Sequence, residues 1–267
     1  MARDTTLECV RTLRNLYVQR GGSVTVPCHY EEQHAPLLKY WCRGYTWDSC
    51  SILINTKSPS TPNMKLSIND DVIQHVFTVT MRNLQDADSG VYWCAAHIPT
   101  ALDHKAHLTI TVIPGPPELQ SEGSVFSGPV GGLVQVRCVF SGRLQRGEKK
   151  WCRSGTVVCL TAGRTSKLSK YSLDTDTHTG VLTVTIRDLR ASDAGWYWCA
   201  GRDTQLPVYV SVGLSRQGTE KPQPQPQTLQ GQTTDHSGAS KNKSARNESI
   251  HSYDSLFQWV FTSTRRE

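Results

Sequence analysis

A repeated set of four cysteines limits what this chain can fold into more than any other feature of its sequence. Residues 78–94 read TVTMRNLQDADSGVYWC and residues 183–199 read TVTIRDLRASDAGWYWC, with ten of seventeen positions identical at an offset of 105. The cysteines of the first copy are Cys28, Cys42, Cys50 and Cys94, and those of the second are Cys138, Cys152, Cys159 and Cys199. The chain therefore contains two copies of one structural unit, and Cys9 lies outside both.

Each copy spans about 100 residues of short alternating segments separated by turn residues, which is typical of a β-sandwich. The expected strands of the first copy are 23–29, 38–43, 51–54, 65–68, 75–81, 90–96 and 106–113. Those of the second copy are 133–140, 149–153, 156–161, 170–173, 181–186, 195–201 and 207–212. The order Cys, Trp, Cys in each copy fits an inter-sheet disulfide packed against a buried indole, which predicts Cys28–Cys94 around Trp41 and Cys138–Cys199 around Trp151.

The element D-x-G-x-Y-x-C, present once in each copy, predicts fold-stabilising residues rather than functional ones. Tyr92 and Tyr197 lie two residues before the second cysteine, where the hydroxyl of a tyrosine corner reaches back to upstream backbone. We expect Asp88 to pair with Lys65, and the repeat predicts the equivalent pair Asp193 and Lys170.

With these residues the chain resembles the immunoglobulin superfamily, V-set, and within it the polymeric immunoglobulin receptor and CMRF-like leukocyte receptors. The resemblance covers residues 16–213 and rests on KYWC and KKWC, where a cysteine directly follows the core tryptophan, and on a further cysteine seven or eight residues later. In that family these cysteines form an extra disulfide, which implies Cys42–Cys50 and Cys152–Cys159. The implied architecture is all-β, with two tandem V-type immunoglobulin sandwiches followed by a disordered stalk.

Strand geometry supports the extra disulfide independently of the resemblance. Because side chains alternate between faces, Cys42 points away from the core when Trp41 points into it, and its nearest partner is Cys50. A zinc site is the alternative, but each copy has only two spare thiols and lacks C-x-x-C and a histidine pair at ligand spacing. Four disulfides favour an oxidising compartment.

The resemblance implies a non-enzymatic immune-type cell-surface receptor ectodomain that takes part in signalling or transport and binds a protein or lipid ligand through V-domain loops. Immunoglobulin and anionic lipid head groups are the candidate partners, and a secreted decoy or an adhesion module on the same fold is the alternative function. We expect ligand contacts in domain 1 at Tyr30, Arg43, Tyr45 and Trp47, since aromatic and arginine anchors dominate interfaces. Trp47 packing over the Cys42–Cys50 bridge is the competing interpretation.

Polar and basic residues near the loops have simpler interpretations. Glu31 and Glu32 beside His34, opposite Asp103 and His104, form a candidate cation site, but we interpret them as solvated loop residues. We therefore predict no metal and no cofactor. In the second copy the basic residues are Arg143, Arg146, Lys149, Lys150 and Arg153. They predict a solvated basic face, with an anionic partner as the alternative.

Composition divides the chain into an irregular N-terminus at residues 1–15, domain 1 at 16–113, domain 2 at 114–213 and a disordered stalk or tail at 214–267. Two N-glycosylation sequons, Asn242-Lys243-Ser244 and Asn247-Glu248-Ser249, lie in that tail. The sequence shows no secretory signal and no apolar run of membrane-spanning length, which we attribute to an incomplete gene model, a soluble isoform or a divergent member of the family.

These features predict a plasma-membrane protein with extracellular domains, or a secreted form. A signalling adaptor is expected only if a membrane segment exists outside this sequence. Catalytic motifs such as G-x-S-x-G, H-E-x-x-H or a P-loop are absent from the sequence, so we expect no enzyme activity. The net charge of +6 is not concentrated enough to indicate nucleic-acid binding.

Overall fold

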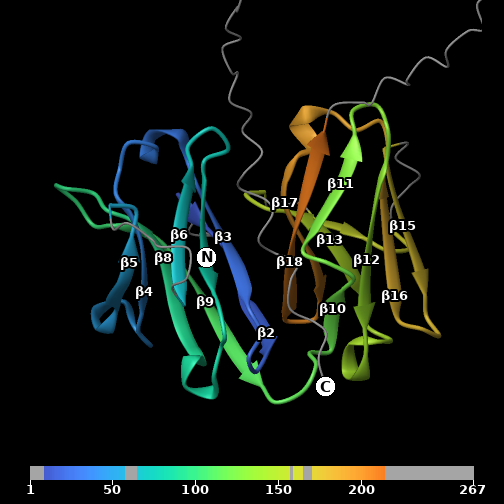
Figure 1. Cartoon of the computed structure of the whole chain (residues 1–267), viewed down its shortest axis with the longest axis horizontal. Coiled ribbons are helices and arrows are strands. Elements are labelled where there is room, and N and C mark those ends of the chain that lie inside the picture. Colours follow the sequence, from blue (N-terminus) through green and yellow to red (C-terminus); the bar gives the residue numbers. More distant parts are fainter. Residues whose placement is uncertain (1–8, 58–64, 157–158, 165–169, 214–267) are drawn as a thin grey trace, which may run out of the picture. The chain divides into compact units, whose positions relative to one another are not determined.

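The chain forms two β-sandwiches (Figure 1). Each is built from a four-stranded and a five-stranded sheet. The computed structural model describes residues 9–57, 65–156, 159–164 and 170–213. Helical structure in these residues consists of short 3-10 turns. The all-β class with two sandwiches is as the cysteine repeat predicts.

Domain 1 carries the first repeat. Its four-stranded sheet has the order β1 (Val10–Arg11), β3 (Val24–Tyr30), β7 (Val76–Met81) and β6 (Leu66–Asp71). Its five-stranded sheet has the order β2 (Asn15–Gln19), β9 (His104–Ile113), β8 (Gly90–Ala96), β4 (Lys39–Arg43) and β5 (Ser51–Asn55). The 3-10 turns are η1 (Glu32–His34), η2 (Trp47–Ser49) and η3 (Asp86–Asp88).

Domain 2 repeats this topology. One sheet has the order β10 (Leu119–Ser121), β12 (Val134–Phe140), β16 (Val181–Ile186) and β15 (Tyr171–Asp176). The other has the order β11 (Val125–Pro129), β18 (Thr204–Gly213), β17 (Gly195–Gly201), β13 (Lys149–Arg153) and β14 (Cys159–Thr161). The 3-10 turns are η4 (Gly142–Leu144) and η5 (Ala191–Asp193).

Four strands, β1, β2, β10 and β11, are missing from the sequence-based expectation. The expected irregular N-terminus is wrong for residues 9–15, because Val10 and Leu13 are fully buried in the core of domain 1. β1 contains only two residues and pairs with β3. β2 pairs in parallel with β9, about 95 residues away in sequence. Such short segments carry too little periodicity to be recognised, and non-local pairing holds them in place.

The core of each domain repeats the same arrangement of disulfide, tryptophan and tyrosine. Disulfides join Cys28 to Cys94, Cys42 to Cys50, Cys138 to Cys199 and Cys152 to Cys159, which are the four expected pairs. Trp41 stacks on Tyr92 with ring centroids 5.2 Å apart, and Trp151 stacks on Tyr197 at 5.0 Å. Both tyrosine rings therefore contribute to the hydrophobic core as well as to the turn before the second cysteine.

The tyrosine corners and the two lysine–aspartate pairs are confirmed. The Tyr92 hydroxyl donates to the Asp88 carbonyl at 2.7 Å, and the Tyr197 hydroxyl donates to the Asp193 carbonyl at 2.9 Å. Lys65 Nζ lies 2.6 Å from Asp88 Oδ2, and Lys170 Nζ lies 2.7 Å from Asp193 Oδ2. Burial acts to raise the pKa of Asp88, but hydrogen bonds from Lys65 and the Gln85 amide outweigh it and lower the pKa. The repeated motif thus stabilises the fold in both domains.

The described residues of both domains belong to one compact unit. Arg11 Nη1 donates to the Gly155 carbonyl at 2.9 Å, and Asn15 Nδ2 donates to the Asp203 carbonyl at 2.9 Å. Trp198 of β17 packs into the hydrophobic cluster of domain 1 and is only 8% exposed. The five-stranded sheet of domain 2 therefore contributes part of its outer face to contacts with domain 1.

Candidate ligand-binding surface of domain 1

An aromatic surface covers the outer face of the five-stranded sheet in domain 1. It consists of Trp47, Trp93, Lys105 and His107, which come from η2, β8 and β9, and the buried Tyr40 of β4 packs beneath it. Trp93 lies between Cys42 and His107 in the strand register, so these side chains form one row across the sheet. Side chains alternate along each strand, and this row therefore lies on the face opposite the core disulfide.

The rings of the aromatic surface pack against the second disulfide. Trp47 meets Trp93 edge to face at a centroid distance of 5.5 Å, and Trp93 lies 4.9 Å from His107. Trp47 and Trp93 form a small cluster with Tyr40, Cys42 and Cys50, separate from the main core. Lys105 Nζ lies 4.2 Å from the centre of the Trp47 ring, a cation–π contact. The surface thus combines partly exposed aromatic rings with a positive charge.

A disulfide and local hydrogen bonds restrain the loop that carries Tyr45. The Cys42–Cys50 disulfide joins its two sides, and Thr46 and Ser49 form a capping box around η2. The Trp93 indole donates to the Gly44 carbonyl at 2.9 Å. Tyr45 itself is 87% exposed. The loop therefore presents a large side chain to solvent from a restrained backbone, which lowers the ordering cost of binding.

Two of the four residues expected to contact a ligand make intramolecular hydrogen bonds that stabilise domain 1. Tyr30 is only 5% exposed, and its hydroxyl donates to Asp70 at 2.7 Å, so its assignment as a ligand contact is wrong. Tyr30 is the last residue of β3, and its side chain points into the core of domain 1. Burial raises the pKa of Tyr30, and the hydrogen bond to Asp70 raises it further.

Arg43 is the second residue of this kind. Its Nη2 donates to the carbonyls of Ala87 and Ser89 at 2.7 Å each. In domain 2, Arg153 Nη2 donates to the Ser192 carbonyl at 2.6 Å in the same way. An interaction that occurs in both domains belongs to the shared fold, so Arg43 has a structural role whether or not a ligand is bound. Tyr45 and Trp47 lie in the loop between Cys42 and Cys50. Trp47 packs against the Cys42–Cys50 disulfide, as the competing interpretation states.

The loops at the end of domain 1 do not form the acidic cation site considered above. Asp103 accepts hydrogen bonds from the Tyr40 hydroxyl, from His97 Nδ1 at 3.1 Å and from the Ile98 amide at 2.9 Å. Burial acts to raise the pKa of Asp103, but these hydrogen bonds outweigh it and lower the pKa. The Asp103 carboxylate therefore orders the loop before β9 rather than facing His34.

The basic residues of domain 2 are largely engaged within the fold. Arg143 pairs with Glu118 at 2.9 Å, and Lys150 pairs with Glu148 at 2.8 Å. Lys149 is 4% exposed and donates to the Gln145 carbonyl at 2.6 Å. Neighbouring acidic and carbonyl oxygens thus offset much of this charge, which weakens the case for an anionic partner on domain 2.

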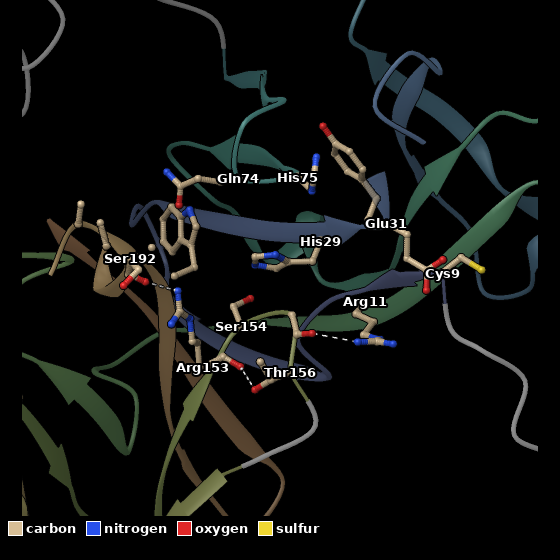
Figure 2. A pocket seen from close by; sticks show the side chains of 16 residues that line it. Cys9, Arg11, His29, Glu31, Gln74, His75, Arg153, Ser154, Thr156 and Ser192 are labelled. Carbon is tan, nitrogen blue, oxygen red and sulfur yellow. Dashed lines mark hydrogen bonds between the residues drawn. The ribbon is translucent and has the colours of Figure 1, made fainter. Parts of the chain in front are cut away.

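A cavity of about 550 Å³ lies between residues of the two domains, as Figure 2 shows. His29 and Gln74 line it from domain 1, and Arg153 and Ser192 line it from domain 2. His29 is largely buried there, and burial together with Arg153 and Arg11 lowers its pKa to about 4. The histidine is therefore neutral at physiological pH.

Sequence reasoning missed Trp93, Lys105 and His107 as parts of a surface. Strand alternation offered a signal for Trp93, because it lies between two inward-facing residues of an expected strand. The pairing of β8 with β9, which places His107 beside Trp93, depends on the fold. The sequons at Asn242 and Asn247 lie outside the described residues. In the described part of the chain, no helix has the length and apolar character needed to cross a membrane.

Comparisons with known proteins agree with this architecture. The model of the immunoglobulin V-set domain family matches residues 12–113 and 120–212. The chain is 24% identical over 212 residues to the polymeric immunoglobulin receptor of Rattus norvegicus, covering 74% of this chain and 27% of that protein. It is 44% identical over 75 residues to CMRF35-like molecule 7 of Homo sapiens, covering 27% of this chain and 37% of that protein.

A solved structure, the teleost fish polymeric immunoglobulin receptor ectodomain, is 40% identical to this chain. The match covers 76% of this chain and 97% of that one, with a TM-score of 0.37. The chain spans only about a quarter to a third of the curated relatives named here. Since the family model matches both domains, the chain belongs to the immunoglobulin V-set family.

Proposed function

We propose that this chain is the ligand-binding part of an immune-type cell-surface receptor and that it binds polymeric immunoglobulin through domain 1. Relatives along most of the two-domain region are named polymeric immunoglobulin receptors, which supports a protein ligand of this class. In this proposal the contact is made by Tyr45 and the aromatic surface next to it.

One observation carries the proposal, namely the restrained and exposed Tyr45 beside Trp47 and Trp93. Tyrosine and tryptophan are enriched among the residues that dominate protein interfaces, because they bury much area at little entropic cost. Lys105 adds a cation at the edge of the same surface. Partly exposed tryptophans beside an exposed tyrosine and a lysine fit a protein partner.

The four disulfides support a site of action outside the cytosol, where thiols stay oxidised. We therefore place both domains on the outer side of the plasma membrane in the native gene product. Surface labelling of intact cells that express the full transcript tests this placement. Labelling only after permeabilisation, with no protein in the medium, contradicts it, whereas protein found only in the medium supports the secreted alternative.

Binding of the full chain to polymeric immunoglobulin, measured by biolayer interferometry, tests the ligand and the surface together. We expect Tyr45→Ala to weaken binding at least about tenfold, since it removes a central aromatic anchor. Ile73→Ala is the matched control, because Ile73 is 88% exposed next to the opposite sheet. We expect it to leave the dissociation constant within about twofold.

Two further arms separate the proposed ligand from the alternatives. Monomeric immunoglobulin tests whether the polymeric form is required, and vesicles containing phosphatidylserine test an anionic lipid surface. Binding to the vesicles without binding to immunoglobulin contradicts the proposal. Equal losses in Tyr45→Ala and Ile73→Ala, or no loss in either, show that the aromatic surface is not the contact.

A further inference from the structure

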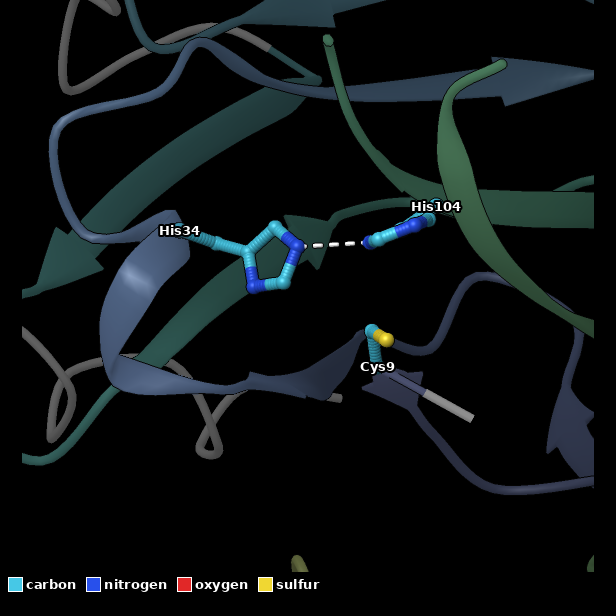
Figure 3. Close-up of side chains that lie close together, drawn as sticks. All are labelled: Cys9, His34 and His104. Atoms are coloured by element: carbon cyan, nitrogen blue, oxygen red, sulfur yellow. Dashed lines mark hydrogen bonds between the residues drawn. The ribbon is translucent and has the colours of Figure 1, made fainter. Parts of the chain in front are cut away.

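Three potential metal ligands from distant parts of the sequence meet at one end of domain 1, as Figure 3 shows. They are Cys9, just before β1, His34 on η1 and His104 at the start of β9. One ligand atom of each lies within 4.8 Å of the others. His34 is 1% exposed, and the other two are partly exposed. Solvent can therefore reach the cluster at Cys9 and His104, while His34 is buried within the domain.

The backbone around Glu31 fixes the positions of two of these residues. The Glu31 amide donates to the Cys9 carbonyl at 3.3 Å, which extends the pairing of β1 with β3. His34 Nδ1 lies 3.2 Å from the Glu31 carbonyl. An N–H at Nδ1 donates to this carbonyl and leaves the Nε2 lone pair directed toward the cluster. Metal-binding histidines in proteins are usually oriented by such a hydrogen bond from the other ring nitrogen.

The two imidazoles face each other through their remaining nitrogens. His34 Nε2 lies 2.6 Å from His104 Nδ1, so the two nitrogens share one proton in a hydrogen bond. With zinc–nitrogen bonds of about 2.0–2.1 Å and tetrahedral angles, the same two nitrogens would stand roughly 3.3 Å apart. A separation of the rings by roughly 0.7 Å accommodates the ion, with the shared proton lost from His104 Nδ1 and a proton taken up from water at its Nε2, so that both imidazoles stay neutral.

We propose that Cys9, His34 and His104 bind a zinc ion, with a thiolate and two imidazoles as protein ligands and a fourth position open to water. This donor set suits zinc, whereas calcium and magnesium require oxygen ligands. The proposal replaces the expectation of no metal, which interpreted His34 and His104 as solvated loop residues and did not include Cys9. It is independent of the proposed ligand, because none of the three residues belongs to the aromatic surface.

A zinc ion at this position joins three segments that the sequence keeps far apart. It ties the N-terminal strand of domain 1 to the loop before β4 and to the loop before β9. Because these loops form one end of the domain, the ion restrains them in one arrangement. An ion that binds only the folded state also stabilises it by mass action.

Calorimetric titration of zinc into the full chain tests the site, using oxidised, tag-free protein that has been stripped with a chelator. We expect one equivalent of zinc to bind, and Cys9→Ser and His104→Gln each to weaken binding by more than about tenfold. His178→Gln, at an exposed histidine of domain 2, is the control, and we expect it to leave the affinity unchanged. Melting temperatures without zinc establish that each variant is folded.

Cobalt(II) gives a second, spectroscopic readout. Binding to wild-type protein should produce a thiolate-to-cobalt charge-transfer band, and this band should persist in His178→Gln and vanish in Cys9→Ser. The absence of the band in wild-type protein overturns the proposal, as does zinc affinity that is unchanged in Cys9→Ser. A disulfide between Cys9 residues of two copies in native protein overturns it as well.

Discussion

Domain 1 and domain 2 share the same fold and core interactions but differ in the side chains that they expose to solvent. Both use the same sheet orders, the same two disulfides, a tyrosine corner and a lysine–aspartate pair. Only domain 1 adds Trp47 and the exposed Tyr45 to the loop closed by the second disulfide. The comparison separates two kinds of residue, since features present in both copies maintain the fold and features present in one are candidates for function.

The interiors of the two domains also differ, around an equivalent buried lysine. Lys39 is fully buried, lies 3.0 Å from Asp70 Oδ2 and contacts the Tyr30 ring. Lys149 contacts the Phe140 ring, and among the described residues it has no carboxylate partner. Burial accordingly lowers the pKa of Lys149. Domain 1 therefore keeps a buried ion pair where domain 2 keeps a lysine bound only to carbonyl oxygens.

The largest expected effect comes from breaking this buried pair. Asp70→Asn leaves the Lys39 ammonium without its counter-charge, and we expect it to lower the free energy of unfolding by about 3 kcal/mol. Calorimetric melting of the full chain provides the measurement. The control is Asp174→Asn, which changes an exposed carboxylate on β15 and should alter stability by less than about 0.5 kcal/mol. Equal effects of the two substitutions would remove the distinction between the interiors.

The second disulfides provide the next comparison. They close loops with sequence separations of 8 and 7 residues. On loop-closure entropy alone, each contributes about 2.5 kcal/mol. We expect the double variants Cys42→Ser/Cys50→Ser and Cys152→Ser/Cys159→Ser to lose similar stability, measured by chemical denaturation.

Their effects on ligand binding should differ, because only the first loop carries Tyr45 and Trp47. The domain 1 double variant should bind polymeric immunoglobulin at least about tenfold more weakly, while the domain 2 variant should bind like the wild type. A greater loss in the domain 2 variant would reverse the assignment of the binding domain.

The smallest expected effect is a pH dependence at the contact between the domains. The pKa of His29 is lowered from 6.5 to about 4 by burial and by Arg153 and Arg11. Between these pH values the unfolded chain binds a proton that the folded chain does not, so stability falls as the pH decreases from about 6.5 toward 4. At pH 5 we expect the loss to be on the order of 2 kcal/mol, and His29→Gln removes it.

Melting temperatures across this pH range, taken as wild type minus variant, isolate the contribution of His29. His178→Gln, at an exposed histidine of domain 2, is the control and should retain the wild-type slope. An unchanged slope in His29→Gln would mean that the domains do not enclose this histidine.

Much of the fold that the two domains share was predictable, because the sequence patterns that indicate it are local. The cysteine repeat, the residue after each core tryptophan and the spacing in D-x-G-x-Y-x-C lie within short stretches of sequence. Alternation along a strand states which side chains share a face, whatever the strand pairs with. The disulfides, the tyrosine corners and the Lys65–Asp88 pair follow from these rules.

Residue type alone did not determine what the side chains near the loops do. Tyr30 and Arg43 were expected at the ligand because aromatic and arginine residues suit interfaces, yet the fold uses both internally. The partners that decide this, Asp70 and Ser89, are about 40 to 46 residues away in sequence. A sequence pattern does not show which of two compatible roles a polar aromatic or cationic side chain takes.

By itself, the sequence determined the number of domains, their class, the disulfide pairs and the residues that close each core. Only the tertiary structure decided that β1 belongs to domain 1 and that Cys9 meets His34 and His104. The physical reason is the range of the interactions. Periodicity and spacing are properties of neighbouring residues, whereas the ends of distant loops come together only when the pairing of β1 with β3 and of β8 with β9 has closed the sandwich.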